Sequence, residues 1–158
     1  MSTHGTFGAF GVAFLAILTL PDAARSDPSL CLNSHPSNEI VKTYPLDPGG
    51  TFALGFIHSV SRTPVVDTYE IAAGQIIQTA EIFKAHGAGL PSTTNEMHAT
   101  GWRHENGHFI LDLERPIGAM IVRVQPEYEN TLHINGQSIA LASLGHVALR
   151  IAACEPSE

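Results

Sequence analysis

The sequence predicts an all-β domain, a single antiparallel β-sandwich or partly open barrel of roughly ten short strands. Short runs of strand-forming residues recur along residues 27–158, and turn signals separate them at close intervals. Almost nothing in this region has the 3.6-residue periodicity of an amphipathic helix. A chain of 158 residues is long enough for one domain with a sizeable core.

The individual strands follow from the turns between them. Asn106-Gly107 and Asn135-Gly136 are the strongest hairpin signals, because both residue types accept the positive φ of a type I′ turn. They predict the hairpins 99–105/108–114 and 131–134/137–142. Further strands are expected at 40–45, 50–60, 65–72, 76–83, 118–125 and 146–153. The last two alternate apolar and polar residues, as antiparallel strands with one wet face do.

Residues 1–26 are expected to be a secretory signal peptide that precedes the domain, 27–158. Residues 7–20 form an apolar stretch, which Pro21 and the small-x-small pattern Ala24-Arg25-Ser26 follow. No Lys or Arg precedes the apolar stretch, so a cleaved leader and a retained anchor both stay open. Fourteen residues are short for crossing a bilayer, which favours export to the periplasm.

The two cysteines stand at opposite ends of the mature chain. A bridge between Cys31 and Cys154 would tie the termini together in an oxidising compartment. Two unrelated buried thiols are the alternative, because sequence alone does not place them within bonding distance.

The charge of the mature chain excludes some partners. Without Arg25 and Asp22, 7 basic residues stand against 14 acidic ones, a net charge of −7. Such a chain lacks the basic surface that nucleic acid or anionic lipid requires. A protein surface or a small molecule is the expected partner.

The segment 56–70 carries the most distinctive polar residues. Pro64 lacks the N–H that a central strand needs, so a hairpin with the turn Ser61-Arg62-Thr63-Pro64 is expected. His58 would then face Asp67, and Phe56 would face Tyr69 on the same side.

A facing imidazole and carboxylate have two interpretations. The carboxylate orients the ring of a functional histidine, or the pair is structural and holds the strand register. Ser59 follows His58 directly and points to the opposite side, so it is not expected to act as a nucleophile with His58. No catalytic residue is assigned.

Two motifs carry a resemblance to a known family. They are His58-Ser59-Val60 with Thr63-Pro64-Val65, Asp67 and Tyr69, and then Phe83 with Gly87-Ala88-Gly89-Leu90-Pro91. In these residues the chain resembles the bacterial domain-of-unknown-function family 1850, over about residues 40–150. Glu is commoner in the family at Asp67, and an aromatic residue at His86. The resemblance implies a small exported partner of TAXI-type TRAP transporters, tripartite importers that use a periplasmic solute-binding protein.

The loop 87–91 and the histidines are the remaining candidates for ligand binding. The loop is either a nest of N–H groups around a carboxylate or a tight turn that needs positive φ. His104 is expected to face Phe109 while Glu105 faces His108, so the two histidines point to opposite sides. No metal motif and no cofactor motif is recognised.

We therefore expect an exported, non-catalytic binding protein, an accessory or regulatory component of a TAXI-type TRAP system. Its partner would be the solute-binding or membrane component of the transporter. The alternative is a small enzyme or binding module that holds a small carboxylate between His58, Asp67 and the loop. The expected recognition residues are His58, Ser59, Arg62, Thr63, Asp67, Tyr69, His86, Gly87, Gly89, Leu90 and Pro91.

Overall fold

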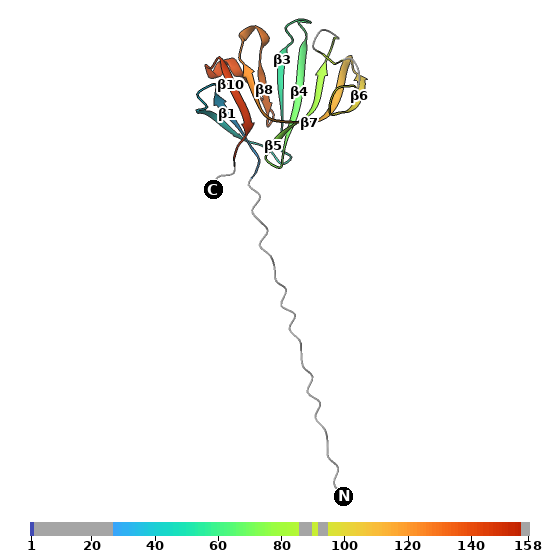
Figure 1. The fold of residues 1–158 in the computed structure, drawn as a ribbon, viewed down its shortest axis with the longest axis vertical. Helices are drawn as coiled ribbons and strands as arrows, with labels where there is room; N and C mark the ends of the chain where they lie inside the picture. Colours follow the sequence, from blue (N-terminus) through green and yellow to red (C-terminus); the bar gives the residue numbers. More distant parts are fainter. Residues whose placement is uncertain (2–26, 86–89, 92–94, 156–158) are drawn as a thin grey trace.

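The computed structural model describes residues 1, 27–85, 90–91 and 95–155. Ten strands form a curled antiparallel sheet with the shape of a half-barrel, which confirms the predicted all-β class (Figure 1). The strands are β1 (Ser29–Ser34), β2 (Ile40–Pro45), β3 (Thr51–Ile57), β4 (Pro64–Ala72), β5 (Gln75–Phe83), β6 (Ala99–Glu105), β7 (His108–Arg123), β8 (Thr131–Ile134), β9 (Gln137–Ala140) and β10 (Ala148–Ala153). Two 3-10 turns, η1 (Pro126–Tyr128) and η2 (Leu141–Leu144), flank the β8–β9 hairpin.

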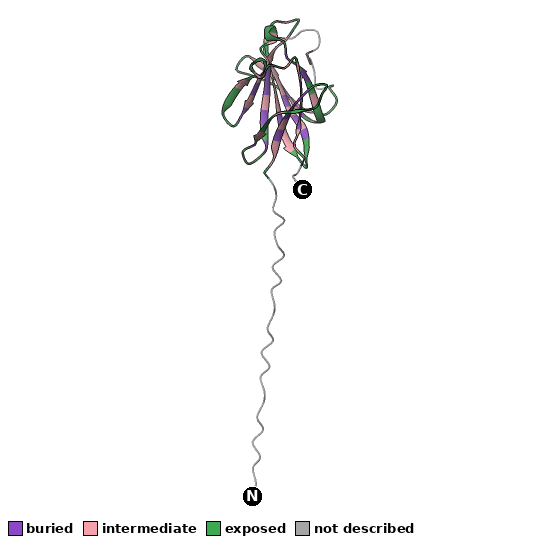
Figure 2. Ribbon diagram, turned by 90° about the vertical axis from the view of Figure 1, so that its left-hand side faces the viewer, coloured by how far each residue is buried: buried purple, intermediate pink, exposed green. Residues whose placement is uncertain are grey.

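The long strand β7 joins the two parts of the sheet. The strand order is β2-β1-β10-β7-β5-β4-β3-β8-β9, and β6 pairs with β7 beside this path. The first half of β7 lies between β5 and β6, whereas its second half pairs with β10. The main core lies where the β1–β10 part faces β3 and β8, and includes Leu30, Leu32, Phe52, Leu54, Tyr69, Ile76, Val122, Leu132, Leu149 and Ile151. Buried residues lie along the central strands, and exposed ones lie in the turns and on outer strands such as β2 and β6 (Figure 2).

Both predicted Asn-Gly hairpins are confirmed. Asn106 and Gly107 have φ of 51° and 76° between β6 and β7, and Asn135 and Gly136 have φ of 48° and 72° between β8 and β9. The Asn135 side chain also holds a distant segment. Its amide donates to the Pro45 carbonyl (2.8 Å), and its oxygen accepts from the Asp47 N–H (3.2 Å).

Two expectations about the strands were wrong. The strands predicted at 108–114 and 118–125 form the single strand β7, because Pro116 falls at a register shift that tolerates its missing N–H. Gly118, with φ of 73°, continues the strand beyond it. Strand β1 was not predicted. It ends in the polar residues Asn33 and Ser34, which do not look like strand residues in the sequence but are buried because β1 lies between β2 and β10.

The Cys31–Cys154 disulfide is present, with the two Cα atoms 5.1 Å apart. It joins β1 to the residue that follows β10, and in the ladder between these neighbouring strands Cys31 pairs with Ala152. The Cys154 N–H donates to the Ser29 carbonyl at 2.8 Å, so the ladder continues to the bridge. The predicted leader falls on residues 2–26, which lie outside the described residues. Within the described part of the chain, no helix has the length and apolar character needed to cross a membrane.

Candidate functional site

The register of the β3–β4 hairpin corrects the predicted His58–Asp67 pair. Pro64 begins β4 instead of ending the turn, because the first residue of a strand tolerates a missing N–H. Ile57 therefore pairs with Pro64, and the His58 N–H donates to the Thr63 carbonyl (2.9 Å). Asp67 faces Leu54 instead of His58, and Tyr69 faces Phe52 instead of Phe56.

His58 stabilises the turn that it begins. Its Nδ1 accepts the N–H groups of Val60 and Ser61, at 3.3 and 3.2 Å. The Arg62 N–H donates to the His58 carbonyl, and the hydroxyls of Ser61 and Thr63 lie 2.9 Å apart. Ser59 and Arg62 are exposed, so the turn presents these two predicted recognition residues to solvent.

Asp67 lies on the inner face of the half-barrel, in a row of directly opposed residues that crosses six strands. From β8 to β6 the row reads Leu132, Leu54, Asp67, Glu81, Leu111 and Trp102. Leu132 and Leu111 are fully buried and Leu54 nearly so. Two carboxyl groups therefore face each other in the middle of an apolar row, with Cβ atoms about 5 Å apart by strand geometry.

The rows on either side differ in character. On one side Tyr69 pairs with Gln78 and Gln78 with Arg115. The Tyr69 hydroxyl donates to Asp67 Oδ2 (3.3 Å), and Arg115 Nη1 donates to Gln78 Oε1 (3.1 Å). On the other side Val65, Phe83 and Phe109 are opposed, and the rings of Phe83 and Phe109 lie 5.7 Å apart.

The environment raises the pKa of both carboxyl groups. Burial is the main cause that raises the pKa of Asp67 to about 7, and the charge of Glu81 adds to it. The Tyr69 hydrogen bond and the Arg115 charge oppose this rise. Burial also raises the pKa of Glu81, against the attraction of Arg115, and the charge of Glu96 raises it further. The pKa of Tyr69 is raised by its own burial and by Asp67.

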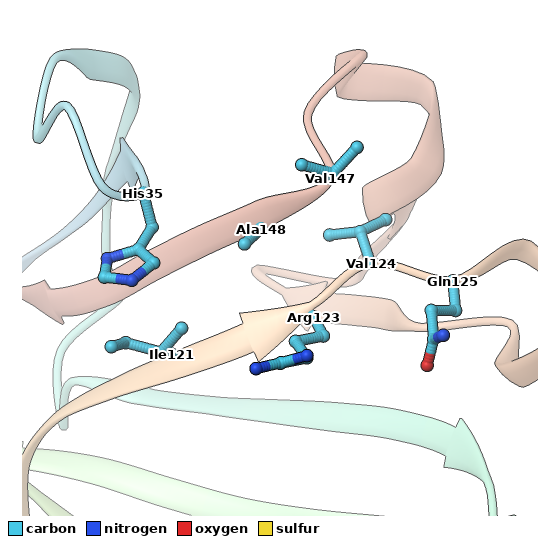
Figure 3. Close-up of a pocket in the computed structure, with 7 residues that line it drawn as sticks. All are labelled: His35, Ile121, Arg123, Val124, Gln125, Val147 and Ala148. Atoms are coloured by element: carbon cyan, nitrogen blue, oxygen red, sulfur yellow. The ribbon is translucent and has the colours of Figure 1, made fainter.

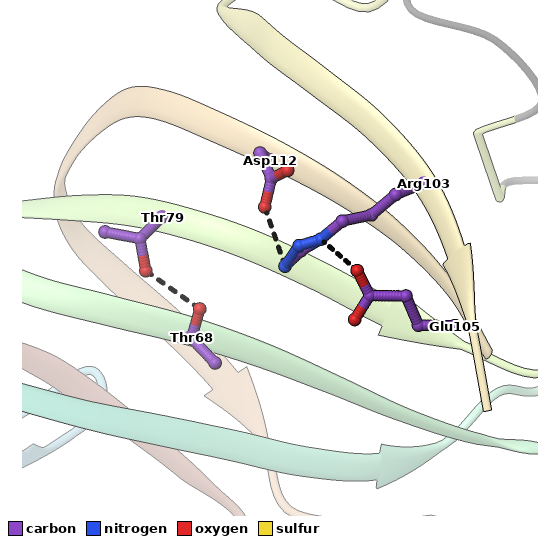
Figure 4. Close-up of polar contacts among 5 residues, drawn as sticks. All are labelled: Thr68, Thr79, Arg103, Glu105 and Asp112. Atoms are coloured by element: carbon purple, nitrogen blue, oxygen red, sulfur yellow. Dashed lines mark hydrogen bonds and ion pairs between the residues drawn. The ribbon is translucent and has the colours of Figure 1, made fainter.

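Asp67 Oδ1 is buried and has no partner within hydrogen-bond geometry among the described residues. The Gln78 side chain is still close enough to lower the pKa of this carboxyl slightly. On the opposite face of the sheet, by contrast, the polar side chains have partners (Figure 4). There the hydroxyls of Thr68 and Thr79 lie 2.8 Å apart, and Arg103 Nη2 lies 3.1 Å from Asp112 Oδ1. A buried carboxyl that lacks one partner and faces a second carboxyl is an arrangement that can hold or move a proton near neutral pH.

Residues 96 and 97, shortly before β6, lie close to this inner face. Arg115 Nη2 donates to the Met97 carbonyl (3.5 Å), and Glu96 is close enough to influence the pKa of Glu81. Leu90 is half-buried and Pro91 is buried. The other predicted loop residues, His86, Gly87 and Gly89, lie outside the described residues. Because Phe83 pairs with Val65, the loop motif starts beside the hairpin motif.

Sequence reasoning missed Gln78, Glu81 and Arg115. Gln78 and Glu81 are three residues apart, a spacing that would place them on opposite faces of a regular strand. The register shift between Thr68 and Tyr69 leaves Thr79 as an extra residue, so Gln78 and Glu81 both face inward. The signal in the sequence that could have revealed the site is Glu81, a charged residue within the otherwise mostly apolar strand β5.

The expected orientation of the histidines is confirmed. His104 faces Phe109, with ring centroids 4.7 Å apart, and Glu105 faces His108. Within residues 27–85, 90–91 and 95–155, no group of three or more His, Cys, Asp or Glu side chains is placed to hold a metal ion.

A family model described as a domain of unknown function, DUF1850, matches residues 52–141, which is more than half of the chain. The chain belongs to this family. No curated protein and no solved structure matches it. The DUF1850 match begins in β3 and ends after β9, so it contains both motifs and the Asp67–Glu81 pair. Strands β1, β2 and β10 and the disulfide lie outside the matched DUF1850 segment.

Proposed function

We propose that this protein is an exported, non-catalytic binding protein that acts as an accessory component of a TAXI-type TRAP transport system. The observation that carries the proposal is the membership of the DUF1850 family. The resemblance of both motifs to that family is what implies an association with such transporters. The Cys31–Cys154 disulfide supports export, because disulfides persist in oxidising compartments such as the periplasm.

The arrangement of the two motifs supports protein recognition. Their inward-facing residues Val65 and Phe83 are fully buried and belong to the apolar wall. Their outward part is the turn 58–63, in which Val60 is 64% exposed and Arg62 is exposed. An exposed apolar residue beside a cation on a well-braced turn suits contact with a partner surface.

The alternative site for a small carboxylate receives less support. It required His58 and Asp67 to converge, yet His58 belongs to the turn and Asp67 to the inner wall. Asp67 also faces Glu81, and a second acidic group repels an anion.

A pull-down with transport measurements tests the proposal. The full-length chain is expressed in cells that contain the TRAP transporter, recovered from the periplasmic fraction, and analysed for co-purified transporter components. We expect the solute-binding or membrane component to be captured, and we expect solute uptake to fall when the gene for this protein is deleted. A variant with Val60→Glu and Arg62→Glu should lose the partner, because it reverses the chemistry of the turn.

The matched control is Ile40→Glu, which changes a residue of similar exposure (71%) on the edge strand β2, away from the turn. Its capture of the partner should equal that of the wild type. Absence of any transporter component together with unchanged uptake would overturn the proposal. Equal loss for the turn variant and the Ile40 control would show that the turn is not the contact surface.

A further inference from the structure

A separate cleft lies at the other part of the sheet, on the outer side of β7 and β10. Its volume is about 700 Å³, within the size range of small-molecule sites. Arg123 pairs with Ala148 across the two strands, and Ile121 lies two residues before Arg123 on the same side. The cleft lies outside the Asp67–Glu81 site, because those carboxyls belong to the inner face of β4 and β5.

The walls of the cleft are apolar, and its polar groups are cationic or neutral. Ile121 and Val147 are 56% and 83% exposed, which is high for residues of this size in a folded domain. Arg123, His35 and Gln125 supply the polar groups, and none of the described residues that line the cleft carries a carboxylate. The guanidinium of Arg123 and the ring of His35 both extend towards Ile121 (Figure 3).

Arg123 forms no ion pair and no side-chain hydrogen bond with any residue in the described part of the chain. This is notable in a protein with a formal net charge of −7. By contrast, Arg103 is paired with Glu105 and Asp112. Arg150 pairs with Ile121 and so stands on the same side of the two strands as Arg123, outside the lining of the cleft. Two arginines on this side make the face locally attractive to anions.

Ala148 gives the cleft its depth. It lies between His35 and Val147 in Figure 3, and its carbonyl accepts the His35 N–H at 3.1 Å. A larger side chain at this position would occupy the space between Arg123 and His35, since it would project from the same side of the sheet.

We propose that this cleft binds an organic carboxylate that carries an apolar chain. The carboxylate pairs with the Arg123 guanidinium, which matches its planar, two-oxygen geometry, and the side chains of His35 and Gln125 lie within the same cleft. The chain of the ligand covers the exposed side chains of Ile121 and Val147 and removes their apolar surface from water. This site is independent of the proposed contact with a transporter.

Sodium octanoate is the probe, with octanol as the uncharged chain-matched control and acetate as the anion without a chain. Each is titrated into the full-length protein, and binding is followed by the ¹H–¹⁵N chemical shifts of the backbone amides. We expect octanoate to bind more tightly than either control and to shift the amides of residues 121–125 and 147–148.

Three variants locate the site. Arg123→Gln should weaken octanoate binding by about tenfold or more, because it removes a charge-assisted pair. Arg103→Gln, which removes a surface arginine from the other part of the sheet, should leave binding unchanged. Ala148→Leu should abolish binding by filling the cleft. Arg123→Gln tests the charge separately, because it changes an exposed side chain and should leave the fold intact.

Four results of the octanoate titrations would each overturn the proposal. These are octanol binding as tightly as octanoate, Arg103→Gln weakening binding as much as Arg123→Gln, octanoate shifts spread over the whole surface, and no saturation with octanoate. Shifts in the same amides that follow protein concentration instead of octanoate would mark an interface between copies, and they too would overturn it.

Discussion

Asp67 carries an ionisable group into an apolar wall, between the buried residues Val65 and Tyr69 of the same strand. One carboxyl oxygen accepts a hydrogen bond from Tyr69, and the other has no partner among the described residues. Burial and the opposed Glu81 both disfavour the charged form. A leucine or valine here would avoid this penalty, so the carboxyl reduces the stability of the fold at neutral and higher pH.

The sign of this effect gives the first prediction. The pKa of Asp67 is raised from 3.8 to about 7 by folding, so the folded state keeps a proton that the unfolded chain releases as the pH rises from about 4 to 7. The free energy of unfolding falls over that range. Asp67→Asn removes the titration, and we expect its stability advantage over wild type to be about 1–3 kcal/mol larger at pH 8 than at pH 5.

Urea denaturation at the two pH values measures this difference. Asp112→Asn is the control, because Asp112 lies on the opposite, wetter face and its ion pair with Arg103 is worth under about 1 kcal/mol. A difference between Asp67→Asn and wild type that is equal at pH 5 and pH 8 would show that Asp67 does not titrate as described.

Among the elements, the β3–β4 turn decides which residues of the first motif reach solvent. His58 accepts two backbone N–H groups and donates its own to Thr63, so the turn is braced from within. Arg62 takes a left-handed conformation, with φ of 54°, at the exposed end of the turn. The same hairpin therefore presents its turn to solvent and contributes its strand residues to the inner wall.

A double-mutant cycle tests this separation. His58→Ala should lower stability by about 1 kcal/mol, because the Val60 and Ser61 N–H groups lose their acceptor and must turn to water. Combined with Asp67→Asn at pH 8, the two effects should add within about 0.5 kcal/mol, since the residues share no partner. A larger coupling, measured by urea denaturation of the four proteins, would restore a direct link between His58 and Asp67.

At the scale of the whole molecule, the two ends of the described domain lie together. Strands β1 and β10 pair directly, and the disulfide joins residues separated by 123 positions in the sequence. In the chain-entropy account, closing so long a loop restricts the unfolded state strongly. The bridge therefore stabilises the half-barrel mainly through the unfolded chain.

Removal of the bridge gives the prediction for this scale. The variant with Cys31→Ala and Cys154→Ala should lose about 3–5 kcal/mol of unfolding free energy. Reductant should lower the denaturation midpoint of the wild type to nearly that of the variant, and it should leave the variant itself unchanged. A wild-type midpoint that does not respond to full reduction, verified by intact mass, would contradict this account.

Local patterns in the sequence determined the fold class, both Asn-Gly hairpins and the orientation of His104 and His108, because period-two alternation and turn residues act over a few positions. The terminal positions of Cys31 and Cys154 also led to the correct bridge. Strand register is different. A single bulge at Thr79 or a proline that begins a strand changes which side chains meet, and only pairing across strands decides it.

The candidate site therefore came from the tertiary structure. Asp67 was recognised in the sequence, but its partners Glu81, Gln78 and Arg115 lie on two other strands and meet it through cross-strand pairing. The cleft beside Arg123 likewise needs His35 from the end of β1 and Val147 from the start of β10. Contacts between distant segments depend on how the whole sheet curls, and no local pattern in the sequence encodes that curvature by itself.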